Sequence, residues 1–454
     1  MKRLVSILIL AISIGHAWAC TAVVASGKVT TDGRPFIFKN RDSSDGLDNS
    51  LVTLKGSRFQ FVGTVNKSSS ASPNSIWYGH NEAGFAILNT LSYYFNSPTA
   101  HSNTSAGALM KKALGQCGTV DEFEALLQQT QSQSSVTLST NFAVMDSLGN
   151  VAIFETSNKS YTKFDVNDET VAPEGYLVRT NFSFTSPYYE TTNHVGEQRY
   201  KSACKYMEDT FGDSKINAVQ LIHELPRYLY HGTKEINLWD EIPEDLDDVR
   251  YTYFNNFIPR FSSASAALMQ GVAQGEPAAH TVSWIAIGWP CASFTVPIVI
   301  TTSLALPEVV KRSPATYMSE MCTDAQQLKK RVFTIRHDGV LCTDSIDLSK
   351  LINMQETGLL QKMTKADEMV NELGNIMLNQ FRAGAAADDE VATYYAWVDD
   401  YWREVYNQVT TAISSVVADA ERDDAYYSIG GIRFNERPSI PGIYINKRHK
   451  VIVR

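Results

Sequence analysis

Long apolar segments are almost absent from this sequence. Only residues 4–14, which follow Lys2 and Arg3, form a continuous run of apolar or small residues. That run is shorter than the ~18 to 20 apolar residues that a membrane helix requires. We therefore expect no membrane span in the mature protein.

Positive charge is also scarce. The chain has 40 Lys and Arg residues against 49 Asp and Glu residues, which gives a formal net charge of −9. Nucleic-acid binding needs clustered cations that neutralise phosphates, so this balance argues against a nucleic-acid partner. The hydrophobic fraction of 44% is ordinary for a globular protein.

Motifs for metals and nucleotides are missing as well. His223 and His231 lack metal-ligand spacing, and the chain has neither a His-Glu-x-x-His motif nor a phosphate-binding glycine loop. We predict no metal and no cofactor. A papain-like pair of His280 and Cys291 is a weak candidate, because the local sequence signature around such a cysteine is absent.

Cysteines are too few for a disulfide scaffold. The chain has 6, spread over its whole length, whereas small secreted scaffolds concentrate theirs. Cys322 and Cys342 are the pair to test first for a disulfide, on sequence proximity alone.

The N-terminus has the three parts of a secretory signal. A basic start and a short apolar run lead to the small-x-small site Ala17-Trp18-Ala19. We expect residues 1–19 to be a signal peptide, so that Cys20 becomes the first residue of the mature chain. A lipid-anchored Cys20 is the alternative, but Trp18 fits a lipoprotein signal poorly and the following residues form a strand pattern instead of a polar tether.

The rest of the chain alternates between strand and helix patterns. Turn signals at residues 30–34, 81–84 and 148–150 separate apolar runs and predict three hairpins. A capping box, Thr119-x-x-Glu122, begins a helical region, and residues 196–226 also have helical spacing. This order predicts an α+β layered domain over residues 20–345.

The C-terminal part has a different character. Apolar residues at helical spacing on both sides of the polar segment AGAAADDE predict a helical hairpin within residues 346–424, with its aromatic residues used for packing. Residues 425–454 are a polar turn region and a short basic strand. This tail is either an edge strand of the domain or a sorting signal of the kind found in exported proteins of Gram-negative bacteria.

An N-terminal cysteine combines two reactive groups on one residue. Its α-amine has an ordinary pKa of ~7.7 to 8.0, so at neutral pH the unprotonated fraction can accept the proton of the thiol. The thiolate then acts as the nucleophile without a histidine. Removal of the signal peptide would supply this amine on Cys20.

Four stretches in a fixed order resemble the cysteine-type N-terminal nucleophile (Ntn) hydrolases of linear amides. This group includes penicillin V acylases, choloylglycine (bile-salt) hydrolases and isopenicillin-N acyltransferases. The stretches are Cys20-Thr21, Lys39-Asn40-Arg41-Asp42, residues 79–89 (GHNEAGFAILN), and DSLGNVAIFETS followed by LVRTN at residues 177–181. The resemblance covers residues 20 to about 300 and implies a four-layer αββα sandwich, to which the helical hairpin is added.

The resemblance also implies roles for individual residues. Cys20 is the nucleophile and Asp42 holds its amine. Asn181 donates its side-chain amide to the tetrahedral oxyanion, with Asn89 or a nearby backbone N–H as the second donor. Each such donor typically stabilises the transition state by ~3 kcal/mol.

Two departures from the bile-salt enzymes point toward the acyltransferase-like members. Lys39 replaces an arginine beside the thiol and keeps the positive charge without the planar guanidinium. Ala266 stands where those enzymes have a second arginine. Arg260 is either a substitute for that arginine or a surface or salt-bridged residue.

We therefore expect an exported amidohydrolase, periplasmic or at the cell surface of a Gram-negative bacterium, that acts on a small-molecule amide through a Cys20 thioester. Acyl transfer to an amine and a dipeptidase-like activity are the enzymatic alternatives. A surface lipoprotein or binding protein on an inactive Ntn scaffold is the alternative of another class. The sequence leaves the oligomeric state open, a homo-oligomer included.

Overall fold

A computed structural model describes residues 20–43, 47–68, 73–100, 102–242, 249–384 and 388–411, together with short segments between residues 426 and 453. The expected signal peptide, residues 1–19, lies outside the described residues. The first described strand begins at Cys20.

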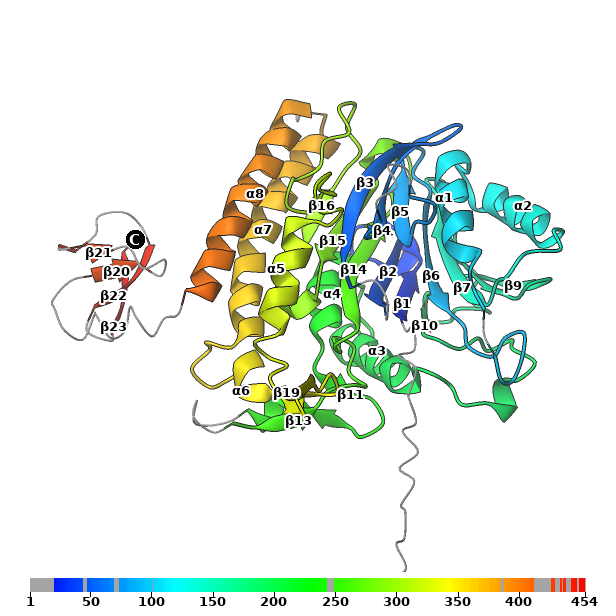
Figure 1. Cartoon of the computed structure of the whole chain (residues 1–454). Coiled ribbons are helices and arrows are strands. Elements are labelled where there is room, and N and C mark those ends of the chain that lie inside the picture. Colours follow the sequence, from blue (N-terminus) through cyan, green and yellow to red (C-terminus); the bar gives the residue numbers. More distant parts are fainter. Residues whose placement is uncertain are drawn as a thin grey trace, which may run out of the picture.

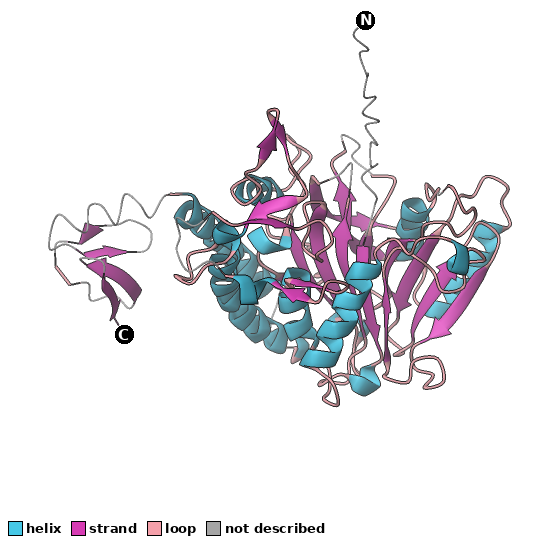
Figure 2. Cartoon of the chain, turned by 90° about the horizontal axis from the view of Figure 1, so that it is seen from below, coloured by secondary structure: helices cyan, strands magenta, loops and turns pink. Residues whose placement is uncertain are grey.

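Two antiparallel sheets lie face to face in the centre of the molecule (Figures 1 and 2). The first has the order β10-β1-β2-β14-β15-β16, formed by Tyr176–Arg179, Cys20–Ala25, Phe36–Asp42, Ser263–Gln270, Val282–Ile287 and Val296–Ile298. The second runs from β3 to β9 in sequence order, formed by Asn49–Lys55, Gln60–Asn66, Tyr78–Asn81, Ala86–Leu91, Thr140–Met145, Val151–Thr156 and Tyr161–Asp165.

The three hairpins predicted from turn signals are present. They are β1–β2, β5–β6 and β7–β8, all antiparallel. In the second hairpin, Oδ1 of Asn81 accepts from the backbone N–H groups of Ala83 and Phe85, and Gly84 has a φ of +80°. Glycine adopts such a left-handed conformation at little cost, so Gly84 allows the chain to turn at this position.

Helices cover the outer face of each sheet. Helices α1 (Ala106–Gln116) and α2 (Val120–Gln131) pack on the second sheet, where Phe123 of α2 meets the rings of Phe142 and Phe154 at centroid distances of 5.5 and 5.3 Å. Oγ1 of Thr119 accepts from the backbone N–H of Glu122, as the predicted cap requires.

The other helix layer covers the first sheet. It contains α3 (Glu197–Thr210), α4 (Ala218–Glu224), α5 (Glu320–Lys329), the short α6 (Leu348–Leu351), α7 (Leu359–Arg382) and α8 (Asp388–Thr410). The predicted αββα sandwich with a C-terminal helical hairpin is therefore confirmed. The hairpin is α7–α8, and its residues Tyr395 and Trp402 are buried against the rest of the layer.

A buried carboxylate ties the hairpin to the domain. Asp367 of α7 accepts from Nδ1 of His223 at 2.6 Å, from Arg227 at 2.5 Å and from the backbone N–H of Thr295 at 2.6 Å. These partners lie on α4, on the following turn and beside β16 (Val296–Ile298). The helical hairpin is thus part of the outer layer through polar contacts as well as apolar ones.

Small sheets complete the chain. Among the described residues, three two-stranded ribbons are present. They pair β11 (Tyr230–His231) with β12 (Ile236–Asn237), β13 (Tyr251–Tyr253) with β19 (Ser345–Asp347), and β17 (Arg336–His337) with β18 (Val340–Leu341). In the tail, Tyr426–Ser428, Arg433–Phe434, Gly442–Asn446 and His449–Val453 form the sheet β21-β20-β22-β23. The pairings described for these four strands join them to one another.

All six cysteines are free. The disulfide between Cys322 and Cys342 that proximity suggested is not formed. Cys322 is buried on α5, where its thiol donates to the carbonyl of Leu47 at 3.2 Å, and Cys342 lies half-buried after β18.

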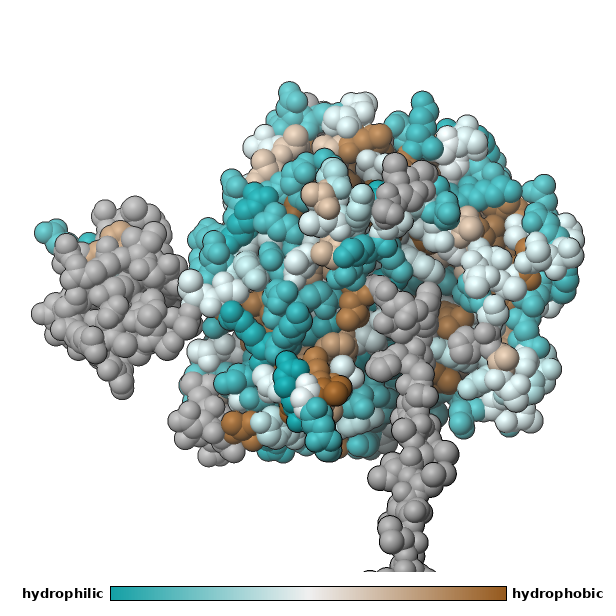
Figure 3. Space-filling view, viewed as in Figure 1, coloured by the Kyte–Doolittle hydropathy of each residue, from teal (hydrophilic) through white to brown (hydrophobic). Residues whose placement is uncertain are grey.

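The face of the molecule shown in Figure 3 is mostly hydrophilic, with small and scattered apolar patches. Within the described ranges, no helix combines the length and the apolar character needed to cross a membrane.

Candidate active site

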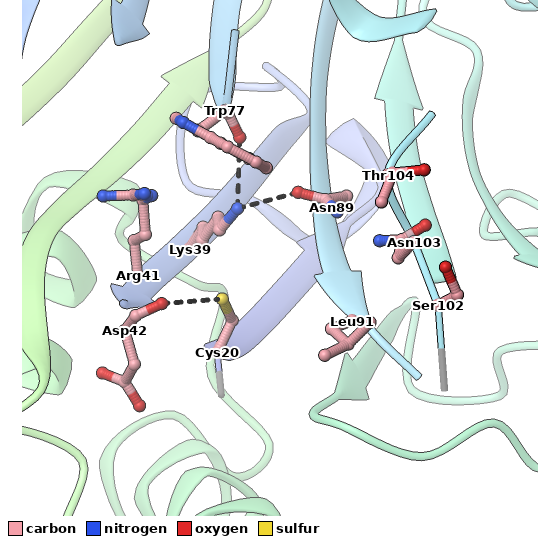
Figure 4. Close-up of a pocket in the computed structure, with 10 residues that line it drawn as sticks. All are labelled: Cys20, Lys39, Arg41, Asp42, Trp77, Asn89, Leu91, Ser102, Asn103 and Thr104. Carbon is pink, nitrogen blue, oxygen red and sulfur yellow. Dashed lines mark hydrogen bonds between the residues drawn. The ribbon is translucent and has the colours of Figure 1, made fainter. Parts of the chain in front are cut away.

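Cys20 lies at the start of β1 and borders a cavity of about 390 Å³ between the two sheets (Figure 4). The side chain is 7% exposed, so the thiol is shielded from bulk solvent while it faces the cavity. The cavity wall also contains Lys39, Arg41, Asp42, Trp77, Asn89, Leu91, Ser102, Asn103 and Thr104. A cavity of this size beside a shielded thiol suits a small organic molecule.

The main chain of Cys20 is held by Asn181. The nitrogen of Cys20 donates to Oδ1 of Asn181 at 2.8 Å, across 161 residues of sequence. The amide nitrogen of Asn181 donates in the opposite direction, to the carbonyl of Leu91 at 2.8 Å. These two contacts fix which end of the carboxamide faces Cys20: it is the oxygen.

Asp42 comes next to Cys20 through the pairing of β1 with β2, in which Cys20 lies opposite Arg41. The thiol of Cys20 is 4.0 Å from the backbone carbonyl of Asp42, and the carboxylate points away from the sulfur (Figure 4). That carboxylate accepts from Nε of Arg260 at 2.9 Å and from Oγ of Ser263 at 2.7 Å. Arg260 therefore forms a salt bridge with Asp42.

An irregularity in the sheet helps to form this contact. The pairing of β14 with β2 shifts between Ser263 and Ser265, so that Ser263 lies opposite Asp42. A bulge of this kind reorients a side chain next to a site. Here it brings the hydroxyl of Ser263 to the carboxylate of Asp42.

Lys39 and Asn89 meet on the other side of the thiol. Nζ of Lys39 donates to Oδ1 of Asn89 at 3.0 Å and to the carbonyl of Trp77 at 3.1 Å (Figure 4). Burial lowers the pKa of Lys39 to about 8, and the nearby Cys20 opposes this shift. Nδ2 of Asn89 donates to Oγ1 of Thr140 at 3.1 Å.

The structure thus brings five of the six predicted site residues to Cys20 or its cavity wall, namely Cys20 itself, Lys39, Asp42, Asn89 and Asn181. The sixth, Arg260, reaches the site through Asp42.

Sequence reasoning missed two arginines. Arg41 lines the cavity, donates to Oδ1 of Asn66 at 2.6 Å and lies over the ring of Trp77 at 5.3 Å. Side chains alternate along a strand, so Lys39 and Arg41 share one face of β2, and this signal was available in the sequence. The second, Arg199, contacts the backbone of Cys20 but lies in a helix without any motif around it.

Among the residues that the structure describes, no group of three or more His, Cys, Asp or Glu side chains is arranged to hold a metal ion.

The family model described as acyl-coenzyme A:6-aminopenicillanic acid acyl-transferase matches residues 29–258, about half of the chain. The chain belongs to this family. The membership confirms the resemblance to the Ntn amide hydrolases and makes the chain an acylase or amidohydrolase of this class. The match begins after Cys20 and does not include it.

Solved structures with a similar arrangement include two bacterial enzymes. A mutant of conjugated bile acid hydrolase from Clostridium perfringens is 11% identical, with 62% of this chain and 92% of that chain covered and a TM-score of 0.37. Penicillin V acylase from Agrobacterium tumefaciens is 13% identical, with 62% and 87% covered and a TM-score of 0.33. At this level they are similarities only. No curated protein matches the chain significantly.

Proposed function

We propose that this chain is an exported amidase that cleaves a linear amide C–N bond through a thioester on Cys20. One observation carries the proposal: the nitrogen of Cys20 is held by Asn181 while the thiol of the same residue faces a cavity. An N-terminal nucleophile needs both of these features, because its amine must be oriented and its thiol must reach a substrate.

The reaction proceeds in two halves. The free α-amine of Cys20 accepts the thiol proton, and the thiolate attacks the substrate carbonyl to give a tetrahedral oxyanion. The ammonium returns its proton to the departing amine as the C–N bond breaks, which leaves the thioester. Water, deprotonated by the same amine, then releases the acid and restores the thiol.

In this proposal, the ammonium of Lys39 stabilises the negative charge that develops in the cavity. The two hydrogen-bond acceptors of this ammonium are a carbonyl and an amide oxygen. Both are neutral, so they do not compensate its positive charge, which can then act on the thiolate and the oxyanion. The donor roles expected for Asn181 and Asn89 remain predictions. Their amide nitrogens each donate to Leu91 or Thr140, and each amide has a second N–H.

Asp42 acts through its charge in this proposal. Its carboxylate is fully buried and is held in place by Arg260 and Ser263.

Acyl transfer to an amine is the second candidate function, because the matching family is described as an acyltransferase. Both reactions share the thioester and differ only in the group that resolves it. Adding an amine acceptor to a reaction with a cleavable amide separates the two: an acyltransferase gives the new amide faster than the free acid, and a hydrolase does not.

Mature exported protein tests the proposal. Intact mass and N-terminal sequencing should give a free Cys20, and lipid on that residue would rule out the amidase mechanism. Wild type, Cys20→Ser and Cys20→Ala are then assayed on phenoxyacetyl, bile-acid and aminoacyl amides, which also covers the dipeptidase-like alternative. Cys204→Ala is the matched control, because Cys204 is a free thiol outside the cavity wall. Turnover that persists in Cys20→Ala contradicts the proposal, and turnover by none of the forms favours a binding protein on an inactive scaffold.

A further inference from the structure

Arg199 joins parts of the N-terminal site that are distant in sequence. It lies in the first turn of α3 and is 2% exposed. Nη1 donates to the carbonyl oxygen of Cys20 at 2.7 Å and to Oγ1 of Thr21 at 3.1 Å, and Nη2 donates to Oδ1 of Asn181 at 2.8 Å. A planar guanidinium can make these contacts simultaneously because its donors have a fixed geometry. One side chain therefore holds both Cys20 and the carboxamide that orients it.

The partners of Arg199 distinguish it from Arg179 and Arg227, two other buried arginines of this chain. Arg179 pairs with Glu155 at 2.8 Å and Arg227 pairs with Asp367 at 2.5 Å. A carboxylate partner of that kind offsets the large cost of burying a cation. The three acceptors of Arg199 are instead a carbonyl, a hydroxyl and an amide oxygen, all neutral.

The charge of Arg199 is retained at this position. Burial lowers its pKa to about 10, with Arg260 acting in the same direction and Asp42 in the opposite one. The group is therefore still protonated at neutral pH. A buried positive charge thus lies directly against the nucleophilic residue.

The loop before α3 is shaped around this guanidinium. Gly196 has a φ of +89°, and a Cβ atom at that position would lie 2.3 Å from Nη2 of Arg199. The carbonyl of Gly196 also accepts from Oγ1 of Thr180 at 3.2 Å, next to Asn181. Glycine is needed here both for the backbone conformation and for the space that the guanidinium occupies.

We propose that Arg199 is a positioning residue that keeps the Cys20 amine oriented and unprotonated. This inference rests on the proposed function. In the full-length chain the Cys20 nitrogen is a peptide nitrogen that donates, like Arg199, to Oδ1 of Asn181. After removal of residues 1–19 the same contact would hold one N–H of the new amine, and its lone pair would be left for the thiol proton. The proton then moves from sulfur to nitrogen, as the S–H bond breaks and an N–H bond forms. A fixed positive charge disfavours protonation of the amine by solvent and favours the thiolate.

Alkylation of Cys20 by iodoacetamide, followed by mass spectrometry of the N-terminal peptide over a range of pH, tests this without a substrate. For Arg199→Met we expect the midpoint of the alkylation profile to move up by about one pH unit, and the rate at neutral pH to fall about tenfold. Arg199→Lys keeps the charge but loses the fork, so its shift should be smaller. Gly196→Ala displaces the guanidinium and should shift the midpoint in the same direction as Arg199→Met.

Arg179→Met is the matched control, since it removes a buried arginine that does not contact Cys20 and should lower Tm without moving the profile. Arg199→Met protein that is folded and has the wild-type midpoint overturns the inference. If that variant does not fold, wild-type midpoints in both Arg199→Lys and Gly196→Ala overturn it. Failure of the proposed function is a separate result, because it appears as turnover in Cys20→Ala or as a blocked Cys20 in the wild type.

Discussion

At the scale of single residues, the site is defined by which end of each side chain faces Cys20. Asn181 presents its oxygen and Asp42 its backbone carbonyl, whereas the ammonium of Lys39 is directed at Trp77 and Asn89. The sequence could identify these residues, since they stand in recognisable motifs. It could not give their orientation, because that depends on partners such as Leu91 and Arg260 that are remote in the chain.

Lys39 should set the alkaline limit of activity. Its pKa of about 8 means that the ammonium is present below that pH and is lost above it. We expect kcat/KM to fall as pH rises through about 8 in the wild type. In Lys39→Arg the guanidinium stays charged, so the alkaline limb should move to higher pH. Lys39→Met should lower kcat/KM by roughly 10²-fold, the typical effect of losing one oxyanion-stabilising group. If the alkaline limb of Lys39→Arg lies at the same pH as that of the wild type, a group other than Lys39 sets this limit.

Asp42 should shift the acid limb of the pH profile of kcat/KM. The direction is opposite to the shift that Arg199 is expected to cause in the alkylation profile. A negative charge near an amine favours its protonated form, so Asp42→Asn should move the acid limb to lower pH. The same variant should lower kcat/KM by about 10²-fold or more, because the carboxylate supports the proton transfers of the amine in this mechanism. Ser263→Ala is the matched control: it removes one hydrogen bond to Asp42 but keeps the charge, so the limb should stay in place. A limb that does not move in Asp42→Asn contradicts this role.

At the scale of elements, local signals explain most of what was predictable. The hairpins β1–β2, β5–β6 and β7–β8 follow from turn residues between short apolar runs, and the hairpin α7–α8 follows from helical periodicity. The order of strands in the first sheet was beyond such signals. There β2 pairs with β14 across more than two hundred residues, and this pairing brings Ser263 to Asp42.

The contact of α7 with the domain should be a main stabilising feature of the outer layer. Asp367→Ala leaves Arg227 buried without its carboxylate, and breaking a buried pair costs about 3–5 kcal/mol. We expect a clear fall in Tm, measured by circular dichroism. Lys365→Met is the matched control on the same helix, because its exposed pair with Glu356 contributes only ~0–1 kcal/mol. Equal Tm values in the two variants would contradict the proposed anchor.

The same contact should make part of the stability depend on pH. The pKa of Asp367 is lowered to about 2, against burial, by Arg227 and His223. The unfolded value is ~3.9, so this stabilisation is complete above pH ~4 and is lost as pH falls toward 2. The free energy of unfolding of the wild type, measured with denaturant, should therefore fall over that pH range. The free energy of unfolding of Asp367→Asn should fall less. An identical pH dependence in the two proteins would exclude Asp367 as the source.

At the scale of the whole molecule, the question is whether the C-terminal tail is part of the catalytic domain. The pairings described for strands β20 to β23 join these strands to one another, which separates them from the two large sheets that form the site. The sorting signal and the edge strand both remain predictions, and truncation of the chain separates them. A chain that ends after Thr411 should then keep the Tm of the full chain and the alkylation rate of Cys20, while its distribution between cells and medium changes. A loss of several degrees in Tm would instead show that the tail stabilises the domain, and an unchanged distribution would remove the case for a sorting signal.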